Sequence, residues 1–165
     1  MDIFKQMSYL CRKKQPNVER KVRLNESSIY ISLKRLREQL YDIQFMMSKT
    51  DRIVYGTPLI GLCRDAMAKF IVAFTVGSQE KKVEYLLESI GYFGVLRCDL
   101  EACVRKNIIH FPARKLTDEE RKNATGADLV SSKKLDLFET VAKIDTEMCR
   151  WQASLAKGKT ITAPK

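Results

Sequence analysis

Apolar side chains recur along most of this 165-residue chain at alternating spacings of three and four residues. That spacing places them on one stripe of an α-helix, as in the helices of a bundle. The pattern begins in residues 25–49, where Asn25 or Ser27 can cap the helix start by accepting bonds from unpaired N–H groups. The stripe of this first predicted helix consists of Ile29, Leu33, Leu36, Leu40, Ile43 and Met47.

A second helix is predicted after a short break at residues 50–56. Thr57-Pro58 supplies a capping residue followed by proline at the first helical position. From there to about Val76 the sequence is apolar nearly all round, as expected of a helix that shares its core with several neighbours.

Gly77-Ser78 ends the second helix and caps a third one over residues 79–107. Gly91 and Gly94 fall inside this third helix, where a glycine costs about 1 kcal/mol relative to alanine. We therefore expect another backbone to approach closely there, with Gly61 of the second helix as the counterpart. The third apolar stripe consists of Val83, Leu86, Ile90, Phe93, Leu96, Leu100 and Val104.

Residues 111–131 have a mixed polar composition, which indicates a linker, and a fourth helix is predicted over residues 133–156. No segment alternates as a β-strand does, and no internal repeat is present. The sequence thus predicts an all-α fold, an up-down four-helix bundle over residues 25–157, followed by a basic tail at residues 158–165. The fourth stripe consists of Leu137, Val141, Ile144, Met148, Trp151 and Leu155.

The formal net charge is +10, and much of it is concentrated near the two termini. Residues 1–24, a basic N-terminal extension, carry seven basic and two acidic side chains, and residues 131–165 carry seven and four. Two interpretations remain open on charge alone. The basic segments can be solvated tails, or they can serve a polyanionic partner, because clustered Lys and Arg gain affinity by releasing counterions from phosphates.

Candidate metal or catalytic chemistry is confined to residues 98–110, which contain Cys98, Cys103 and the single histidine, His110. On one helix the two thiols point about 140° apart, and Cys103 and His110 lie about 10 Å apart, too far to share one zinc ion. The chain also lacks a phosphate-binding glycine loop and the common nucleophile and metal motifs. We therefore expect no catalysis, no metal and no cofactor.

The odd, scattered set of five cysteines implies no disulfide framework and favours a reducing cytoplasm. The first residues lack the uninterrupted apolar region of a signal peptide. The longest apolar run contains Arg64, Asp65 and Lys69, which indicates a buried helix rather than a membrane span. We expect a cytoplasmic protein without a membrane partner.

A set of shared sequence features gives this chain a resemblance to a known family. They lie between residues 29 and 155: a lysine and an arginine before a Tyr-Gly pair, a lysine-led third helix, a Leu-Arg pair within it, and a tryptophan near the end of the fourth helix. Arg150 stands where the family has glycine. The matching residues are Lys49, Arg52, Tyr55, Gly56, Lys82, Tyr85, Leu86, Leu96, Arg97 and Trp151. The chain resembles the four-helix-bundle family that includes the accessory variability determinants of diversity-generating retroelements and proteins encoded in intervening sequences of large-subunit ribosomal RNA.

The resemblance implies a non-catalytic accessory subunit that forms a ring, usually a homo-pentamer. Such a ring binds the element's reverse transcriptase and its template RNA, with DNA as a second candidate, and supports mutagenic cDNA synthesis. The N-terminal extension and the 111–131 linker depart from the family pattern. The alternatives are a protein of the ribosomal intervening-sequence type, or a helical adaptor that binds another protein.

Basic residues on the predicted helices, opposite the core stripes, are the candidates for nucleic-acid contacts, together with basic residues of the N-terminal extension. We expect them to contact phosphates without reading base sequence, because no base-reading motif is present. These candidates are Lys34, Arg35, Arg37, Arg97, Arg105, Lys106, Arg12, Lys13 and Lys14.

Overall fold

The described residues of the computed structural model, 23–112, 117 and 131–157, are almost entirely helical. They contain no strand, so the all-α prediction is confirmed for this part of the chain. The predicted tail, nearly all of the basic extension and most of the linker lie outside these residues. The four long helices are α2 (Ser28–Gln44), α4 (Thr57–Thr75), α5 (Gln79–Arg105) and α7 (Ser132–Ala156). The short elements are η1 (Leu24–Glu26), α3 (Lys49–Asp51) and the π-helical η2 (Arg52–Gly56).

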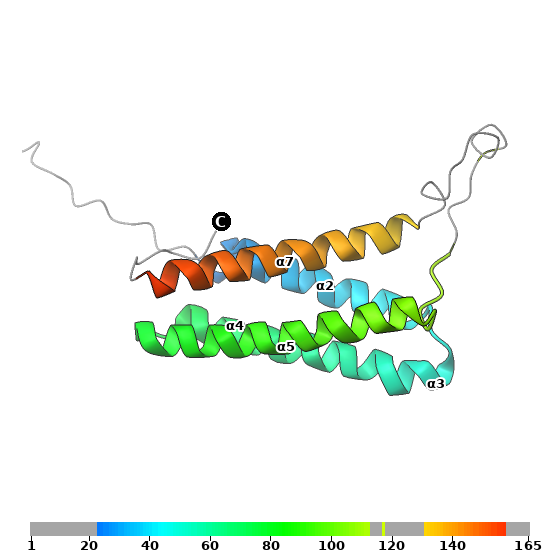
Figure 1. The fold of residues 1–165 in the computed structure, drawn as a ribbon, viewed down its shortest axis with the longest axis horizontal. Helices are drawn as coiled ribbons and strands as arrows, with labels where there is room; N and C mark the ends of the chain where they lie inside the picture. The colour runs from blue at the N-terminus through cyan, green and yellow to red at the C-terminus, as the bar shows by residue number, and fades with distance from the viewer. Residues whose placement is uncertain (1–22, 113–116, 118–130, 158–165) are drawn as a thin grey trace, which may run out of the picture.

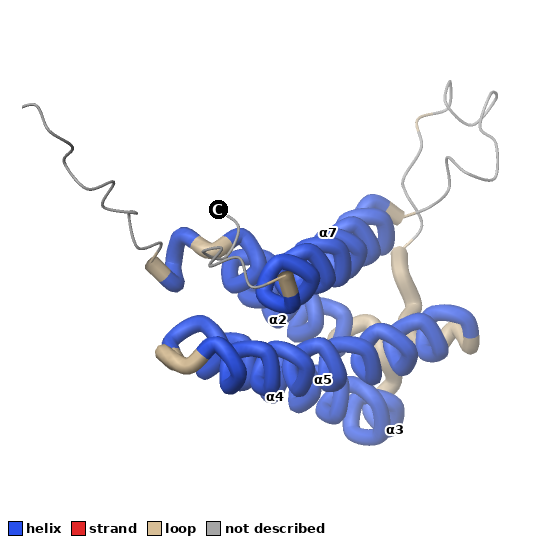
Figure 2. Tube along the Cα trace, turned by 60° about the vertical axis from the view of Figure 1, so that its left-hand side comes forward, coloured by secondary structure: helices blue, strands red, loops and turns tan. Residues whose placement is uncertain are grey.

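The long helices lie side by side (Figures 1 and 2), and their buried apolar side chains form one core. α4 and α5 pack against each other most extensively, while α2 contacts α4 and α7, and α7 also contacts α5. The α4–α5 contact is close enough for a buried hydroxyl to reach across it, since Ser89 Oγ donates to the carbonyl oxygen of Ala66 at 2.8 Å. The helices therefore follow one another around the core in the order α2, α4, α5, α7.

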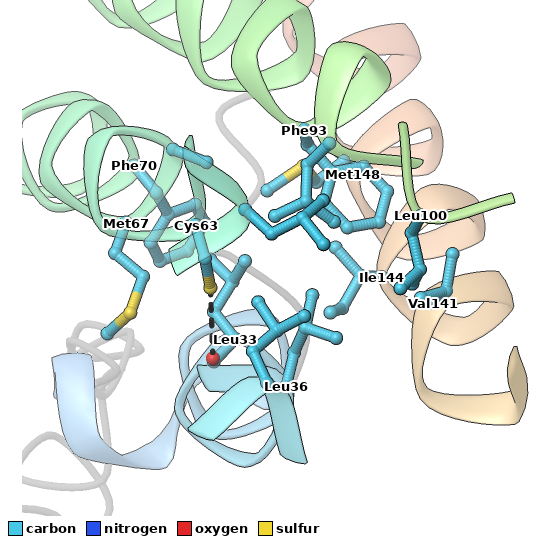
Figure 3. Close-up of a cluster of buried hydrophobic side chains, with 14 of the residues drawn as sticks. Leu33, Leu36, Cys63, Met67, Phe70, Phe93, Leu100, Val141, Ile144 and Met148 are labelled. Carbon is cyan, nitrogen blue, oxygen red and sulfur yellow. Dashed lines mark hydrogen bonds between the residues drawn. The ribbon is translucent and has the colours of Figure 1, made fainter. Parts of the chain in front are cut away.

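The predicted apolar stripes form this core (Figure 3). Every residue of the first and fourth predicted stripes is buried, although Met47 lies beyond the end of α2. On α5 four stripe residues are buried: Leu86, Phe93, Leu96 and Leu100. The other three, Val83, Ile90 and Val104, are partly buried and pack against the core. Each fully buried Leu, Ile or Phe side chain contributes about 1.5–3 kcal/mol, so these stripes account for the association of the helices.

The predicted break before the second helix is wrong, because residues 49–75 are helical without interruption. Ser48 caps this run, its Oγ accepting a bond from the Asp51 N–H at 3.1 Å. Thr57 is not a cap: its N–H and its hydroxyl both donate to the carbonyl oxygen of Arg52, the hydroxyl at 3.3 Å. Pro58 cannot donate a bond to the preceding turn, and the wider π-turn lets the helix continue through it.

Of the other predicted helix caps, one forms its capping hydrogen bond and two do not. Ser78 caps α5, where its Oγ accepts from the Lys81 N–H at 3.5 Å. Ser27 immediately precedes α2, but its Oγ is buried and makes no hydrogen bond to any residue that the structure describes. Asn25 lies inside the short helix η1 and does not begin α2.

The predicted close approach at Gly61, Gly91 and Gly94 is also wrong within this chain. A Cβ added at any of the three would meet no atom within 4 Å. The crowded glycine is Gly56, where an added Cβ would lie 3.0 Å from Gln44 Cγ and 3.2 Å from Met47 Sδ. The small residues that let α4 approach α5 include Ala66 and Ser89, while Gly91 is exposed on the outer side of α5.

Candidate nucleic-acid interface

The three candidate cations of α2 occupy different surroundings. Lys34 is exposed and makes no ion pair within the described residues. The Arg35 guanidinium pairs with Asp136 of α7, whose other oxygen accepts a bond from Gln39 Nε2 at 2.6 Å. Arg37 is half-buried, close enough to Cys63 of α4 for its charge to act on the pKa of that thiol. Of these three side chains, only Lys34 is both exposed to solvent and without an ion-pair partner among the described residues.

The three candidate cations of α5 divide similarly. Arg97 Nη1 donates to Asp145 of α7 at 2.9 Å, and its Nε lies 3.9 Å from Glu101 Oε1. Arg105 and Lys106, at the end of the helix, are exposed and have no ion pair among the described residues. Arg97 therefore joins two helices, whereas Arg105 and Lys106 carry free positive charge.

The structure does not gather the six helix cations into one patch. α2 and α5 are separated around the core by α4 and α7, so their outward faces point in different directions. Arg35 and Arg97 instead hold α7 from either side through Asp136 and Asp145. The remaining candidates, Arg12, Lys13 and Lys14, lie outside the described residues.

A further ion pair between two helices was not predicted from the sequence. Lys69 of α4 pairs with Glu88 of α5, and its Nζ lies 5.5 Å from the centre of the Tyr85 ring. The hydrogen bond that Lys69 donates to the Glu88 carboxylate raises the pKa of Lys69. Lys69 and Glu88 are 19 residues apart, and no helical spacing connects residues of separate helices. Only the packing of α4 on α5 brings this pair together.

The sequence also did not reveal an apolar surface at the end of the molecule where α2 leads into α3, hereafter the open end. Phe45 is 76% exposed there and Ile53 is 68% exposed. Val54 and Tyr55, which follow Ile53 in the chain, are exposed as well. Arg52 fixes this region, because its Nε donates to the Gln44 carbonyl at 3.0 Å and its guanidinium lies over the Phe45 ring at 5.3 Å. The one signal in the sequence was that these four apolar residues fall outside the predicted stripes.

A cavity of about 280 Å³ lies next to this surface. Residues of η2 and the start of α4 form one wall, and the last two turns of α5 with Ile108 form the other. The chain beyond α5 is anchored nearby, since the His110 N–H donates to the Met46 carbonyl at 2.9 Å. The cavity therefore has walls fixed by helices and by backbone hydrogen bonds.

The thiols have two kinds of environment. Cys63 is fully buried and its Sγ donates to the Leu33 carbonyl at 3.9 Å (Figure 3); burial raises its pKa to about 12. Burial also raises the pKa of Cys103, with Asp99 and Asp51 adding to the shift. Cys98 is exposed. The described residues contain no group of three His, Cys, Asp or Glu side chains that could hold a metal ion.

Comparisons with protein families, with curated proteins and with solved structures found no match to this chain. Among the helices of the described residues, none combines the length and the hydropathy needed to cross a lipid bilayer.

Proposed function

We propose that this protein is a non-catalytic accessory subunit of a diversity-generating retroelement. It binds template RNA and the element's reverse transcriptase in the cytoplasm and supports mutagenic cDNA synthesis. In this proposal the four long helices form an up-down bundle that assembles into a ring of five copies. The proposal rests on the sequence resemblance and on the distribution of positive charge over the helices.

The observation that carries RNA binding is a division among the cations. Arg35, Lys69 and Arg97 pair with acids of a neighbouring helix. Lys34, Arg105 and Lys106 have no acid partner in the described part of the chain and face solvent. Structural pairing thus leaves exposed lysines and arginines available, in a chain of net charge +10. Such residues bind phosphates through counterion release.

The test is fluorescence anisotropy with a labelled RNA hairpin and a labelled single strand between about 50 and 200 mM salt. Arg105→Ala/Lys106→Ala should lower the affinity about tenfold, because a phosphate that the protein no longer neutralises keeps its condensed counterions. The log–log salt slope should become shallower by roughly one to two units. Lys34→Ala/Arg37→Ala tests the α2 face in the same way.

The matched control is Lys81→Ala/Lys157→Ala, which removes the same charge from positions near the opposite end of the molecule, the start of α5 and the end of α7. If all three double variants lose affinity equally, net charge alone governs binding and no helix face is assigned. An affinity that does not change with salt would refute phosphate binding altogether.

Self-association is supported by a stripe on the outer side of α5. Leu87, Gly91, Val95 and Cys98 are exposed, recur every three or four residues and carry no charge. The open space over Gly91 and Gly94 would let another helix approach closely. Exposed apolar stripes of this kind are uncommon on monomers and typical of interfaces between protein chains.

Light scattering after size exclusion measures the copy number. Val95→Glu should dissociate the assembly, since it places a charge in the centre of the stripe. Leu135→Glu on α7 is the control, because Leu135 and Val95 have almost equal exposed fractions, 53% and 51%. A monomeric wild-type protein at micromolar concentration, or equal dissociation by both variants, would contradict the assignment.

A further inference from the structure

The cavity at the open end has the size and lining of a receptor for one side chain. Its volume of about 280 Å³ is below the roughly 300–1,000 Å³ typical of sites for whole small-molecule ligands. Val54, Tyr55 and Pro58 line one side, and Ala102, Cys103 and Ile108 line the other. An aromatic or large aliphatic side chain fits this volume and this apolar lining.

The wall formed by η2 is fixed before anything binds. The π-turn is held by the bonds of Thr57 to the Arg52 carbonyl, and Arg52 is itself bonded to the Gln44 carbonyl. Gly56 fits tightly against Gln44 and Met47. A preorganised apolar surface loses little conformational entropy on binding, and π-turns are frequent at functional sites.

The charged residues at the cavity indicate which kinds of residue flank the bound side chain in the partner. Asp99 and Lys106 both line the cavity on α5, seven residues and therefore about 10 Å apart on one side of the helix. Neither makes an ion pair within the described residues. The cavity thus has an acid toward one end and a base at the other, with apolar side chains between them.

We propose that this cavity is a docking site for a protein partner that inserts an aromatic or aliphatic anchor flanked by one basic and one acidic residue. The basic residue pairs with Asp99 and the acidic residue with Lys106. Val54, Tyr55 and Pro58, which line the cavity, surround the anchor and become covered, as in the ring of contacts that excludes water around a binding hot spot. The site shares Lys106 with the proposed RNA contacts, but its test uses peptides in the absence of RNA and does not depend on RNA binding.

The probes are four short peptides with blocked termini: Lys-Phe-Glu, Lys-Phe-Lys, Glu-Phe-Glu and Lys-Gly-Glu. Titration is followed by the amide NMR signals of Ala102, Cys103 and Ile108, without RNA present. Lys-Phe-Glu should bind most tightly, with a Kd of roughly 1 mM, and Lys-Gly-Glu should not bind. Adenosine monophosphate tests the alternative that the cavity takes a nucleotide base.

Charge exchange provides the decisive comparison. Asp99→Lys should weaken Lys-Phe-Glu about threefold to tenfold and make Glu-Phe-Glu the preferred peptide, as expected for one exposed ion pair. Lys106→Glu should make Lys-Phe-Lys the preferred peptide. Ala102→Leu, which fills the cavity, should weaken all three phenylalanine peptides equally. Glu139→Lys, on the exposed side of α7, should change nothing.

Three results would overturn the proposal. The first is the absence of signal changes with all the peptides at about ten times the expected Kd. The second is equal affinity of the three phenylalanine peptides for the wild-type protein, or an unchanged order of preference in both charge variants. The third is tighter binding of adenosine monophosphate than of Lys-Phe-Glu.

Discussion

Both ends of the molecule carry large apolar side chains, but these are buried at one end and exposed to solvent at the other. At the end where α4 leads into α5, hereafter the closed end, Phe70 and Phe74 pack around Trp151 with ring centres 5.4 and 6.4 Å from the indole. Trp151 is only 3% exposed there. At the open end Phe45 and Ile53 are largely exposed to solvent. Both ends are rich in apolar side chains, and among the described residues only the closed end is covered by other parts of the chain.

Because of this difference, apolar residues stabilise the fold at one end of the molecule and remain available to bind a partner at the other. Apolar area stabilises the fold only when folding removes it from water, at about 25 cal/mol per Å². The aromatic cluster of the closed end therefore contributes to the free energy of unfolding. The side chains of the open end contribute little to it, and their apolar area remains available for a partner.

The largest expected effect compares one substitution at both ends. Phe70→Ala removes a fully buried ring and should lower the free energy of unfolding by about 3–5 kcal/mol, because it loses both transfer energy and packing. Phe45→Ala should change it by less than about 0.5 kcal/mol. Urea denaturation followed by circular dichroism measures both values. Similar losses from the two variants would show that the open end is covered in the native protein.

A second comparison uses pH and the two buried thiols. The pKa of Cys63 is about 12 in the folded protein and 9.0 when unperturbed. Above pH 9 the unfolded chain therefore releases a proton that the folded one keeps, and this favours unfolding. Cys63 should cost the protein stability at about 1.4 kcal/mol per pH unit between these two pKa values. The pKa of Cys103 is raised as well, so that thiol acts in the same direction.

Denaturation at pH 8, 9 and 10 (chosen to straddle the unperturbed thiol pKa of about 8.5–9) is the measurement, and Cys63→Ala is the control for the other groups that titrate in this range. The variant should lose less stability than the wild type as pH rises. Equal pH dependence of the two proteins would mean that the Cys63 thiolate is accommodated in the fold.

The smallest expected effect concerns two glycines of the same helical run. Gly61→Ala should stabilise the protein by about 0.5–1 kcal/mol, because alanine favours helix and the added Cβ meets open space. Gly56→Ala should gain less or lose stability, since its Cβ would press on Gln44 and Met47. Thermal unfolding of both variants ranks them. An equal gain would show that the contact of the π-turn with α2 can relax.

The sequence predicted those parts of the fold that depend on neighbours along one helix. All the apolar residues of the first and fourth predicted stripes are buried, because three- and four-residue spacing directly determines which side chains share a helix face. The π-turn was missed because Thr57-Pro58 satisfies the rules for a helix start, while the bonds that continue the helix run to Arg52. The outward position of Gly91 was missed because spacing along a helix does not distinguish a glycine that faces solvent from one that packs closely against another helix.

The candidate site was predicted less well for a related reason. Arg35 pairs with a residue 101 positions away and Arg97 with one 48 positions away. Periodicity showed correctly that both lie off the core stripes, but it contains no information about which helix comes to lie beside them. The charge surplus was evident in the composition, whereas the division into paired and unpaired cations depends on packing.

The single tryptophan gives the closed end an optical signal of its own. The indole of Trp151 is enclosed by Phe70 and Phe74, and its Nε1 has no hydrogen-bond partner within the described part of the chain. Its emission should lie at short wavelength in the native protein and shift to the red on unfolding, because only the unfolded chain exposes the ring to water dipoles. Events at the open end take place at the far end of the helices and should leave this spectrum unchanged. Intrinsic fluorescence thus distinguishes loss of the fold from occupation of the cavity without any label.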